Sequence, residues 1–121
     1  MGFYETIGEV YTAEGRDFGL MVDDLLQKSA GNGTVARMIF FGKPDNNEVY
    51  IKRLNIIRQK IKELYKEQMP VVSYVAQRPL DGDFVLEVYK IQPNPKVEIE
   101  YCDTGLLNYL KVEDSDHSAL I

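Results

Sequence analysis

The strongest constraint on the fold is an amphipathic repeat near the middle of the chain. Apolar residues recur there at steps of four, three, four and three, at Tyr50, Leu54, Ile57, Ile61 and Leu64. Lysine and arginine stand between them, so one side of a helix would be apolar and the other charged. This spacing predicts a long amphipathic helix over residues 47–67, which must bury its apolar side against another layer.

Two short apolar runs flank this helix and are typical of buried strands. The first covers residues 34–41, and the second covers residues 71–75 after Pro70. Each run is too short for a helix and is apolar on both sides. A strand, a helix and a second strand in this order permit a parallel pair joined by a right-handed crossover.

A second, shorter helix is predicted over residues 17–30. Apolar residues recur at three- and four-residue steps from Phe18 to Leu26, and Asp17 stands before them as an N-cap. The sequence Gly-Asn-Gly at 31–33 then ends the helix. The chain therefore carries two helices that are able to cover one sheet.

Strand patterns account for most of the remaining chain. We expect one or two strands in residues 1–12, with a turn near Gly8, and further strands at 84–91 and 97–102. Residues 103–121 are weakly patterned. The expected fold class is α+β, a mixed sheet with two helices on one face.

The length of 121 residues permits one domain. Its expected core covers residues 17–91, and residues 92–121 add a strand and a tail. The strands at 38–41 and 71–75 are apolar on both sides, yet two helices cover only one face of a sheet. The sequence therefore predicts a homo-oligomer in which another copy covers the second face.

Composition argues against several classes of function. The net charge of −5 and a pI near 4.9 leave no basic surplus for a phosphate backbone, so we expect no nucleic-acid partner. A single cysteine and a single histidine cannot form a zinc site, and neither metal nor cofactor is expected. No long apolar run or leader-like segment is present, which predicts a cytoplasmic protein without a membrane partner.

A motif after the long helix carries a family resemblance. Pro70 opens Pro-Val-Val-Ser-Tyr-Val, and Glu87 lies in Phe-Val-Leu-Glu-Val-Tyr. The interval between Pro70 and Glu87 equals the interval between a Pro-x-Arg-Ser motif and a Val-Glu-Ile-Glu strand in the RidA/YjgF family. Residues 35–91, about half the chain, are similar to the centre of that family. The resemblance implies a chorismate-mutase-like fold and a trimer with ligand clefts between subunits.

The resemblance also implies a site. Active members of the family hydrolyse 2-aminoacrylate-type enamines and imines, with an arginine that binds the substrate carboxylate and a glutamate that positions water. Here Glu87 fills the glutamate position and Ser73 the serine position, but Val72 fills the arginine position. Because valine cannot bind a carboxylate, the chain looks like a divergent member without deaminase activity.

Two arginines are candidates for a different anion contact. Arg58 falls on the helix position where active members often carry an asparagine. Arg78 stands before Pro79 in a predicted loop, where it could instead pair with Asp81 or Asp83. An arginine on an amphipathic helix is usually solvated surface, so each has a simpler interpretation.

The other polar candidates also have simpler interpretations. Glu87 could be a solvent-facing residue of an alternating strand, and Ser73 could bond to a neighbouring backbone group. Cys102 is more typical of a small buried residue than of a nucleophile. His117 lies in a polar tail, where a lone histidine is ordinarily solvated.

Residues outside the matched segment depart from the family. The chain before the first helix is shorter, and about 30 residues follow Ile91 where a typical member ends. The strand at 97–102 would either replace a missing edge strand or lead into a second domain. The segment Ser-Tyr-Val-Ala-Gln at 73–77 is weakly similar to a segment in the degenerate half of chorismatase-type tandem proteins.

Three functions therefore remain open. The favoured one is a non-deaminase RidA-like module that binds a small carboxylate or another small molecule, or serves as an accessory subunit. The second is an enzyme with an altered site, in which Glu87 performs acid–base work on an imine, an enamine or a cyclic carboxylate. The third is a structural oligomerisation domain.

Overall fold

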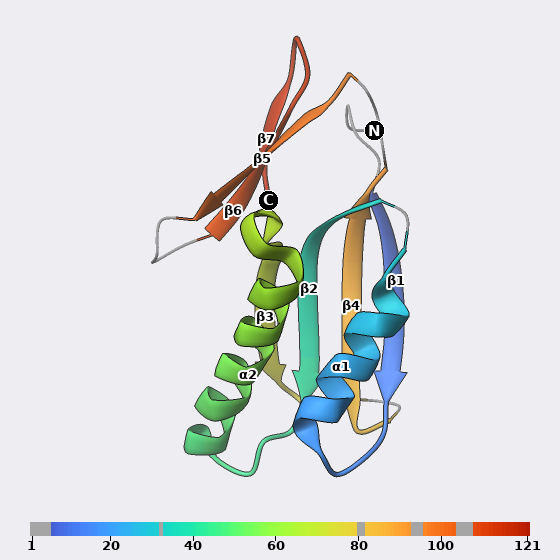
Figure 1. The fold of residues 1–121 in the computed structure, drawn as a ribbon, viewed down its shortest axis with the longest axis vertical. Helices are drawn as coiled ribbons and strands as arrows, with labels where there is room; N and C mark the ends of the chain where they lie inside the picture. Colours follow the sequence, from blue (N-terminus) through green and yellow to red (C-terminus); the bar gives the residue numbers. More distant parts are fainter. Residues whose placement is uncertain (1–5, 32, 80–81, 93–95, 104–107) are drawn as a thin grey trace.

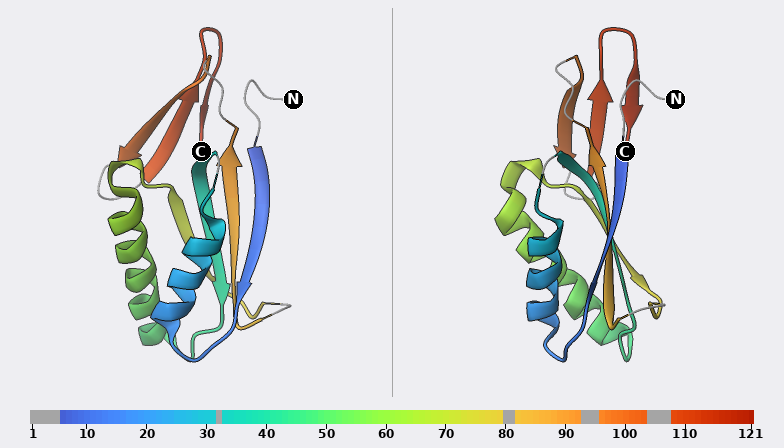
Figure 2. Two further views of the ribbon diagram at one scale, coloured as in Figure 1. Left: turned by 45° about the vertical axis from the view of Figure 1, so that its right-hand side comes forward. Right: turned by 90° about the vertical axis from the view of Figure 1, so that its right-hand side faces the viewer.

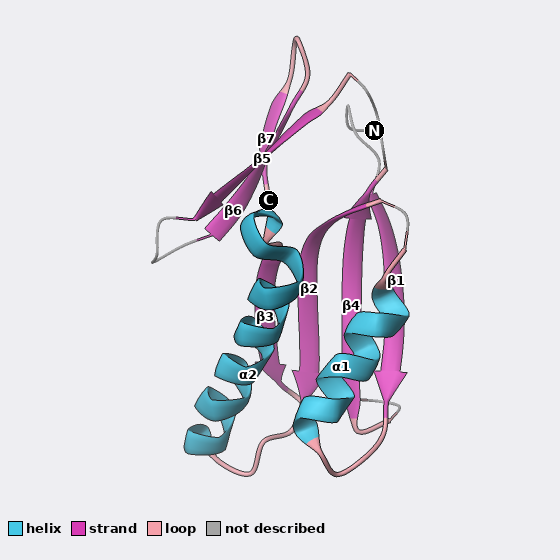
Figure 3. Ribbon diagram, in the orientation of Figure 1, coloured by secondary structure: helices cyan, strands magenta, loops and turns pink. Residues whose placement is uncertain are grey.

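The computed structural model describes residues 6–31, 33–79, 82–92, 96–103 and 108–121. A larger layer of strands and helices carries a smaller sheet at one end (Figures 1 and 3). The elements in chain order are β1 (Thr6–Ala13), α1 (Phe18–Ser29), β2 (Thr34–Gly42), α2 (Asn47–Tyr65), the 3-10 helix η1 (Lys66–Gln68), β3 (Val71–Ala76), β4 (Phe84–Ile91), β5 (Glu98–Asp103), β6 (Asn108–Glu113) and β7 (Ser118–Leu120).

The larger sheet has the strand order β1-β4-β2-β3. Strands β2 and β3 are parallel and are joined by α2, as the apolar runs predicted. Strand β4 lies between β1 and β2 and is antiparallel to both. The prediction of an α+β fold with a mixed sheet and two helices on one face is therefore confirmed.

Both helices pack on the same face of this sheet (Figure 2), which we call the covered face. Asp17 caps α1 as predicted, because its Oδ1 accepts a hydrogen bond from the Leu20 backbone N at 3.0 Å. Asn46 caps α2 in the same way through Val49 N at 2.9 Å. The fully buried side chains between helices and sheet include Val22, Leu25, Met38, Phe40, Ile57, Ile61, Leu86 and Val88.

The first strand differs from the prediction. Residues 6–13 form one continuous strand without a turn at Gly8, which lies opposite Tyr89 of β4. A Cβ at Gly8 would lie 3.4 Å from the Tyr89 ring, so the glycine leaves room for that ring. Residues 1–5 of the predicted segment lie outside the described residues.

The C-terminal segment corrects a second expectation. The strand predicted at 97–102 exists as β5, but it does not join the edge of the larger sheet. It pairs antiparallel with β6, which pairs with β7, so part of the segment expected to be a tail is a three-stranded sheet. Strand β6 buries only Leu110 and Val112 among its described side chains, and β7 has three residues, so neither gave a pattern long enough to be recognised in the sequence.

The small sheet is attached to the larger one through a hydrophobic cluster. Leu110 and Val112 of β6 are fully buried against Ala36 of β2 and Ile91 of β4. Val71 at the start of β3 also packs against this cluster. The two sheets therefore share buried side chains at the end of the larger sheet where β4 finishes.

Candidate functional site

Among the described residues, no helix covers the face of the larger sheet opposite α1 and α2, which we call the open face. The small sheet packs only against its end, at Val71 and Ile91. Side chains alternate along each strand, so the residues opposite Glu87 fall on the same face. Glu87 pairs with Val10 of β1 and with Ile39 of β2, and Ile39 in turn pairs with Ser73 of β3. These four paired residues, one from each strand, form a row across the sheet. Glu87 and Ser73 therefore lie beside the apolar residues Val10 and Ile39.

The neighbouring row on the open face is more apolar. Thr12 pairs with Val85, Val85 with Phe41, and Phe41 with Val75. The last three side chains are only half buried, and Val10 in the first row is 63% exposed. This much exposed apolar surface in the middle of a sheet is unusual for a face that meets only water.

The connection from β3 to β4 crosses this face. Because β4 pairs on the far side of β2, the chain after β3 must pass over the end of β2. Figure 2 shows the connection on the side away from the helices. Gln77, Arg78 and Pro79 then line a hollow of about 410 Å³ with open-face residues that include Phe41 and Glu87.

Hydrogen bonds fix both ends of this connection. Gln77 N donates to Val75 O at 2.8 Å, which turns the chain immediately after β3. At the other end, Asp83 N donates to Ala13 O at 3.1 Å, and the Asp83 carboxylate accepts from Gly15 N at 3.1 Å. The segment that carries Arg78 is therefore attached to β1 as well as to its own strands.

Glu87 is held by a neighbour on its own strand. The Tyr89 hydroxyl donates a hydrogen bond to Glu87 Oε2 at 3.2 Å. The negative charge of Glu87 raises the pKa of the Tyr89 phenol, and the hydrogen bond acts in the same direction. Tyr89 therefore remains protonated at neutral pH and keeps one carboxylate oxygen oriented, while the other can accept a hydrogen bond.

The structure brings only some of the predicted site residues together. Arg78 and Glu87 line the same hollow. Ser73 lies on the same face but two strands from Glu87, and it is not among the lining residues. Val72 is 7% exposed and packs in the core on the covered face, and Arg58 is exposed on α2, which covers that face.

Two features of the hollow were missed in the sequence. Gln77 and Phe41 line it, but they become neighbours only because the connection crosses β2, which requires knowledge of the strand order. The strand period of two could, however, have shown that Val72 and Ser73 point to opposite faces. Because of this alternation, Val72, which fills the position of the family arginine, points away from the open face.

The described residues offer no other obvious reactive centre. No group of three or more His, Cys, Asp or Glu side chains among them is arranged to hold a metal ion. Cys102 is half buried in β5, opposite Tyr109. His117 is exposed in the turn before β7, where its Nδ1 lies 3.1 Å from Asp114 Oδ1.

Comparisons with known proteins do not identify a relative. No family model, curated protein or solved structure matches the chain. Among the described residues, no helix is both long enough and apolar enough to cross a membrane.

Proposed function

We propose that the protein is a non-deaminase RidA-like module of the cytoplasm, which binds a small carboxylate in the open-face hollow and assembles through the same face. The observation that carries the proposal is that Arg78 and Glu87 line one hollow on an otherwise apolar sheet face. The resemblance to the RidA/YjgF family supplies the expectation of a cleft between subunits. The replacement of the family arginine by Val72 argues against deaminase activity.

The chemistry of the hollow favours a small anionic ligand with an apolar body. The Arg78 guanidinium offers a planar pair of donors that matches a carboxylate. Phe41, Val10 and Val85 supply an apolar floor, and Glu87 would accept a hydrogen bond from a ligand donor. Arg78 thus replaces the family arginine in role, from a loop and not from a strand.

Self-association is proposed from the same face. Its central residues are apolar and incompletely buried in one chain, which favours burial against a second copy. A trimer is the assembly that the resemblance implies, and its neighbouring subunits would close the hollow. The hollow and the interface would then be one surface, so ligand binding and assembly should be linked.

The assembly is tested by measuring the molar mass in solution by light scattering. The 13.9 kDa chain should elute as a trimer, and Val10→Asp should convert it to a monomer. Leu20→Asp is the matched control, because Leu20 is 67% exposed on α1, on the opposite side, whereas Val10 is 63% exposed. A wild-type monomer at high concentration, or equal dissociation by both variants, would refute assembly through the open face.

Ligand binding is tested by calorimetry with a panel of small 2-oxo and aromatic carboxylates. Arg78→Gln should weaken binding of any carboxylate ligand at least tenfold. Arg58→Gln removes an equivalent charge from α2 and should leave the affinity unchanged. If no carboxylate binds to the assembled protein, or if both variants bind equally, the hollow is not a carboxylate site and the domain is better described as structural.

An altered enzyme is the second candidate, and the hydrogen bond from Tyr89 to Glu87 is the observation that favours it. A carboxylate oriented in this way can act as a general base on a bound imine, enamine or cyclic carboxylate. Glu87→Gln should then abolish turnover while leaving carboxylate binding measurable. Persistence of turnover in this variant would remove the enzymatic role of Glu87.

A further inference from the structure

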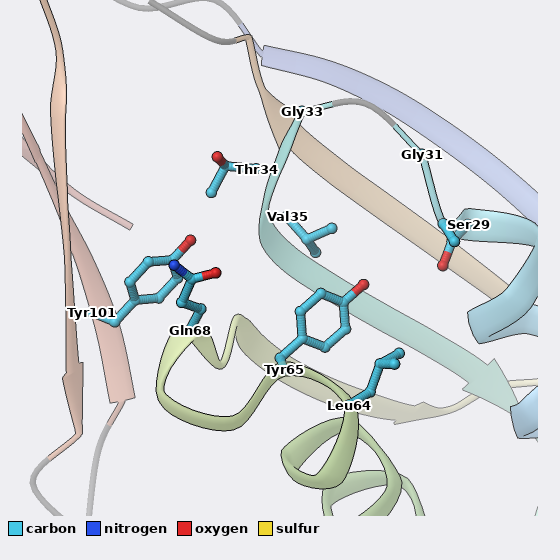
Figure 4. A pocket seen from close by; sticks show the side chains of 10 residues that line it. Ser29, Gly31, Gly33, Thr34, Val35, Leu64, Tyr65, Gln68 and Tyr101 are labelled. Atoms are coloured by element: carbon cyan, nitrogen blue, oxygen red, sulfur yellow. The ribbon is translucent and has the colours of Figure 1, made fainter. Parts of the chain in front are cut away.

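A second hollow lies between the helices and the small sheet, separate from the open face. It has a volume of about 310 Å³ and is lined by residues from the end of α1, the start of β2, the end of α2, η1 and β5. Figure 4 shows it from close by, with Tyr65 of α2 and Tyr101 of β5 on its walls. Residues far apart in the sequence therefore meet where the two parts of the molecule join.

The two tyrosine rings are supported from different sides. Tyr65 packs against the core under the helices, and Tyr101 packs against the cluster that attaches the small sheet. Burial raises the pKa of both phenols, and Tyr65 raises the pKa of Tyr101 further. Both hydroxyls are therefore protonated at neutral pH and available as donors, and each ring is held in place by packing.

Polar groups complete the lining. Gln68 and Thr34 also line the hollow, so its walls carry an amide and a hydroxyl besides the two phenols (Figure 4). Within the described part of the chain, the side chains of Tyr65, Gln68 and Tyr101 form no hydrogen bond with protein. By contrast, Ser29 Oγ already donates to Leu26 O at 3.1 Å.

The lining residues that the structure describes carry no charge. None of them is Asp, Glu, Lys, Arg or His, although 27% of the chain is Asp, Glu, Lys or Arg. A phosphate or carboxylate in this hollow would lose water without gaining a counter-charge. An uncharged ligand carries no such cost, so the lining selects against ionised compounds.

We propose that this hollow binds an uncharged planar heterocycle of the nucleobase type, either free or as a nucleoside. Aromatic side chains bind such rings by stacking, and a glutamine amide offers an adjacent donor and acceptor that match the edge of a base. The volume lies at the lower end of the range for small-molecule sites, which suits a ligand of this size. The site does not depend on the open-face hollow or on its carboxylate ligand.

The test is a titration followed in two-dimensional amide NMR spectra of the full chain. The probes are adenosine, guanosine, cytidine and uridine, with the four corresponding 5′-monophosphates and glucose as comparison compounds. At least one nucleoside should shift the Gln68 side-chain amide and the Gly31 and Gly33 backbone amides in a saturable manner. The matching nucleotide should bind at least tenfold more weakly, because no cation in the lining meets its phosphate.

Variants distinguish this site from non-specific association. Gln68→Ala and Tyr101→Leu should each raise the dissociation constant at least tenfold. Gln59→Ala and Tyr109→Leu are the matched controls, since both residues lie on the same elements or sheet but outside the lining, and they should leave it unchanged. If Tyr101→Leu does not fold, Gln68→Ala with its control carries the test alone.

Three results would overturn the proposal. No saturable shift with any nucleoside up to its solubility would show that the hollow does not bind bases. Tighter binding of the nucleotide would show that a phosphate site elsewhere is responsible. Equal shifts with glucose, or equal losses in Gln59→Ala and Gln68→Ala, would show that the amide and the rings do not recognise a heterocycle.

Discussion

The Lys90 ammonium nitrogen lies 2.7 Å from Glu9 Oε1, and Lys90 is only 5% exposed. The pair joins β1 to β4 on the covered face, near the end of α1. The Tyr11 hydroxyl donates to the other carboxylate oxygen at 2.9 Å. A buried cation is tolerated here because one carboxylate compensates it. The Glu9 side chain is 32% exposed as a whole, although its Oε1 is buried, and Tyr11 is its second partner.

This asymmetry predicts unequal effects of removing each partner. Glu9→Gln leaves the Lys90 charge buried without compensation and should lower the free energy of unfolding by about 3 kcal/mol. Lys90→Met leaves Glu9 Oε1 buried without its cation, but Oε2 keeps the Tyr11 hydrogen bond and the side chain is partly exposed, so this change should cost less than Glu9→Gln. Urea unfolding measures both changes, with Asp24→Asn as a control in the exposed Asp24–Lys28 ion pair that should change stability by less than about 0.5 kcal/mol. An equal cost for the two partners would contradict the asymmetry.

Glu9 also predicts a pH dependence. Hydrogen bonding from Lys90, followed by that from Tyr11, holds the pKa of Glu9 below its ordinary value of 4.5. A lowered folded pKa means that the stabilisation is fully present above about pH 4.5 and is lost as the pH falls through the folded value. Urea unfolding between pH 6 and pH 2 should show this loss in the wild type, and Glu9→Gln should lack that part of it. Parallel curves for the two proteins would argue against the assignment.

The hairpin between β6 and β7 contains a second carboxyl group, Asp114, whose pKa is lowered as that of Glu9 is. Asp114 Oδ1 accepts from the backbone N of Asp116 at 2.8 Å and of His117 at 2.7 Å, and these bonds lower the Asp114 pKa. Asp114→Ala should therefore increase amide exchange in β7 at neutral pH. Asp116→Ala, which keeps the backbone donor, is the control. Equal exchange in both variants would show that Asp114 does not organise the turn.

The interaction between Glu87 and Tyr89 predicts a shifted phenol titration. Glu87 raises the Tyr89 pKa mainly by its charge, so Glu87→Gln should move that pKa back towards the ordinary tyrosine value. NMR of the Tyr89 ring carbons at alkaline pH measures the shift. Glu98→Gln, in the small sheet, is the control and should leave the Tyr89 titration in place. An unchanged Tyr89 pKa in Glu87→Gln would contradict the orientation proposed for the carboxylate.

A side chain at Gly82 should destabilise the connection between β3 and β4, whose residues line the hollow. Its φ of +71° lies in the left-handed region, and an added Cβ would meet Ala13 O at 3.3 Å. Gly82→Ala should therefore destabilise the protein by about 1 kcal/mol or more and weaken ligand binding that depends on Arg78. Gly31→Ala is the control for stability, because its Cβ would make only an ordinary 3.6 Å contact with Lys90 Nζ.

The sequence predicted the parts of the fold that depend on local periodicity. The spacing from Tyr50 to Leu64 indicated α2, and Ile57 and Ile61 of that series are fully buried. Asp17 correctly indicated where α1 begins. These elements are readable because a helix displays its buried side every three or four residues, whatever the tertiary contacts are.

The site depended on information that local patterns do not contain. Glu87 was identified because its spacing from Pro70 matches the spacing in the RidA/YjgF family. Arg78 was identified only as a residue of a predicted loop. Their common hollow follows from the insertion of β4 between β1 and β2, which forces the connection across the open face. Tyr65 and Tyr101 were missed because their hollow forms between the helices and the small sheet, and the small sheet was not predicted.

The central place of β4 has a consequence for the order in which the chain can fold during synthesis. Strand β4 is the last of the four strands to leave the ribosome, yet it supplies the pairing partners of both β1 and β2. Until residues 84–91 emerge, β1 has no strand to pair with in this sheet. The helices also lack the part of the covered face that β4 supplies, which includes Leu86 and Val88. Completion of the larger sheet must therefore wait until Ile91, the last residue of β4, has left the ribosome.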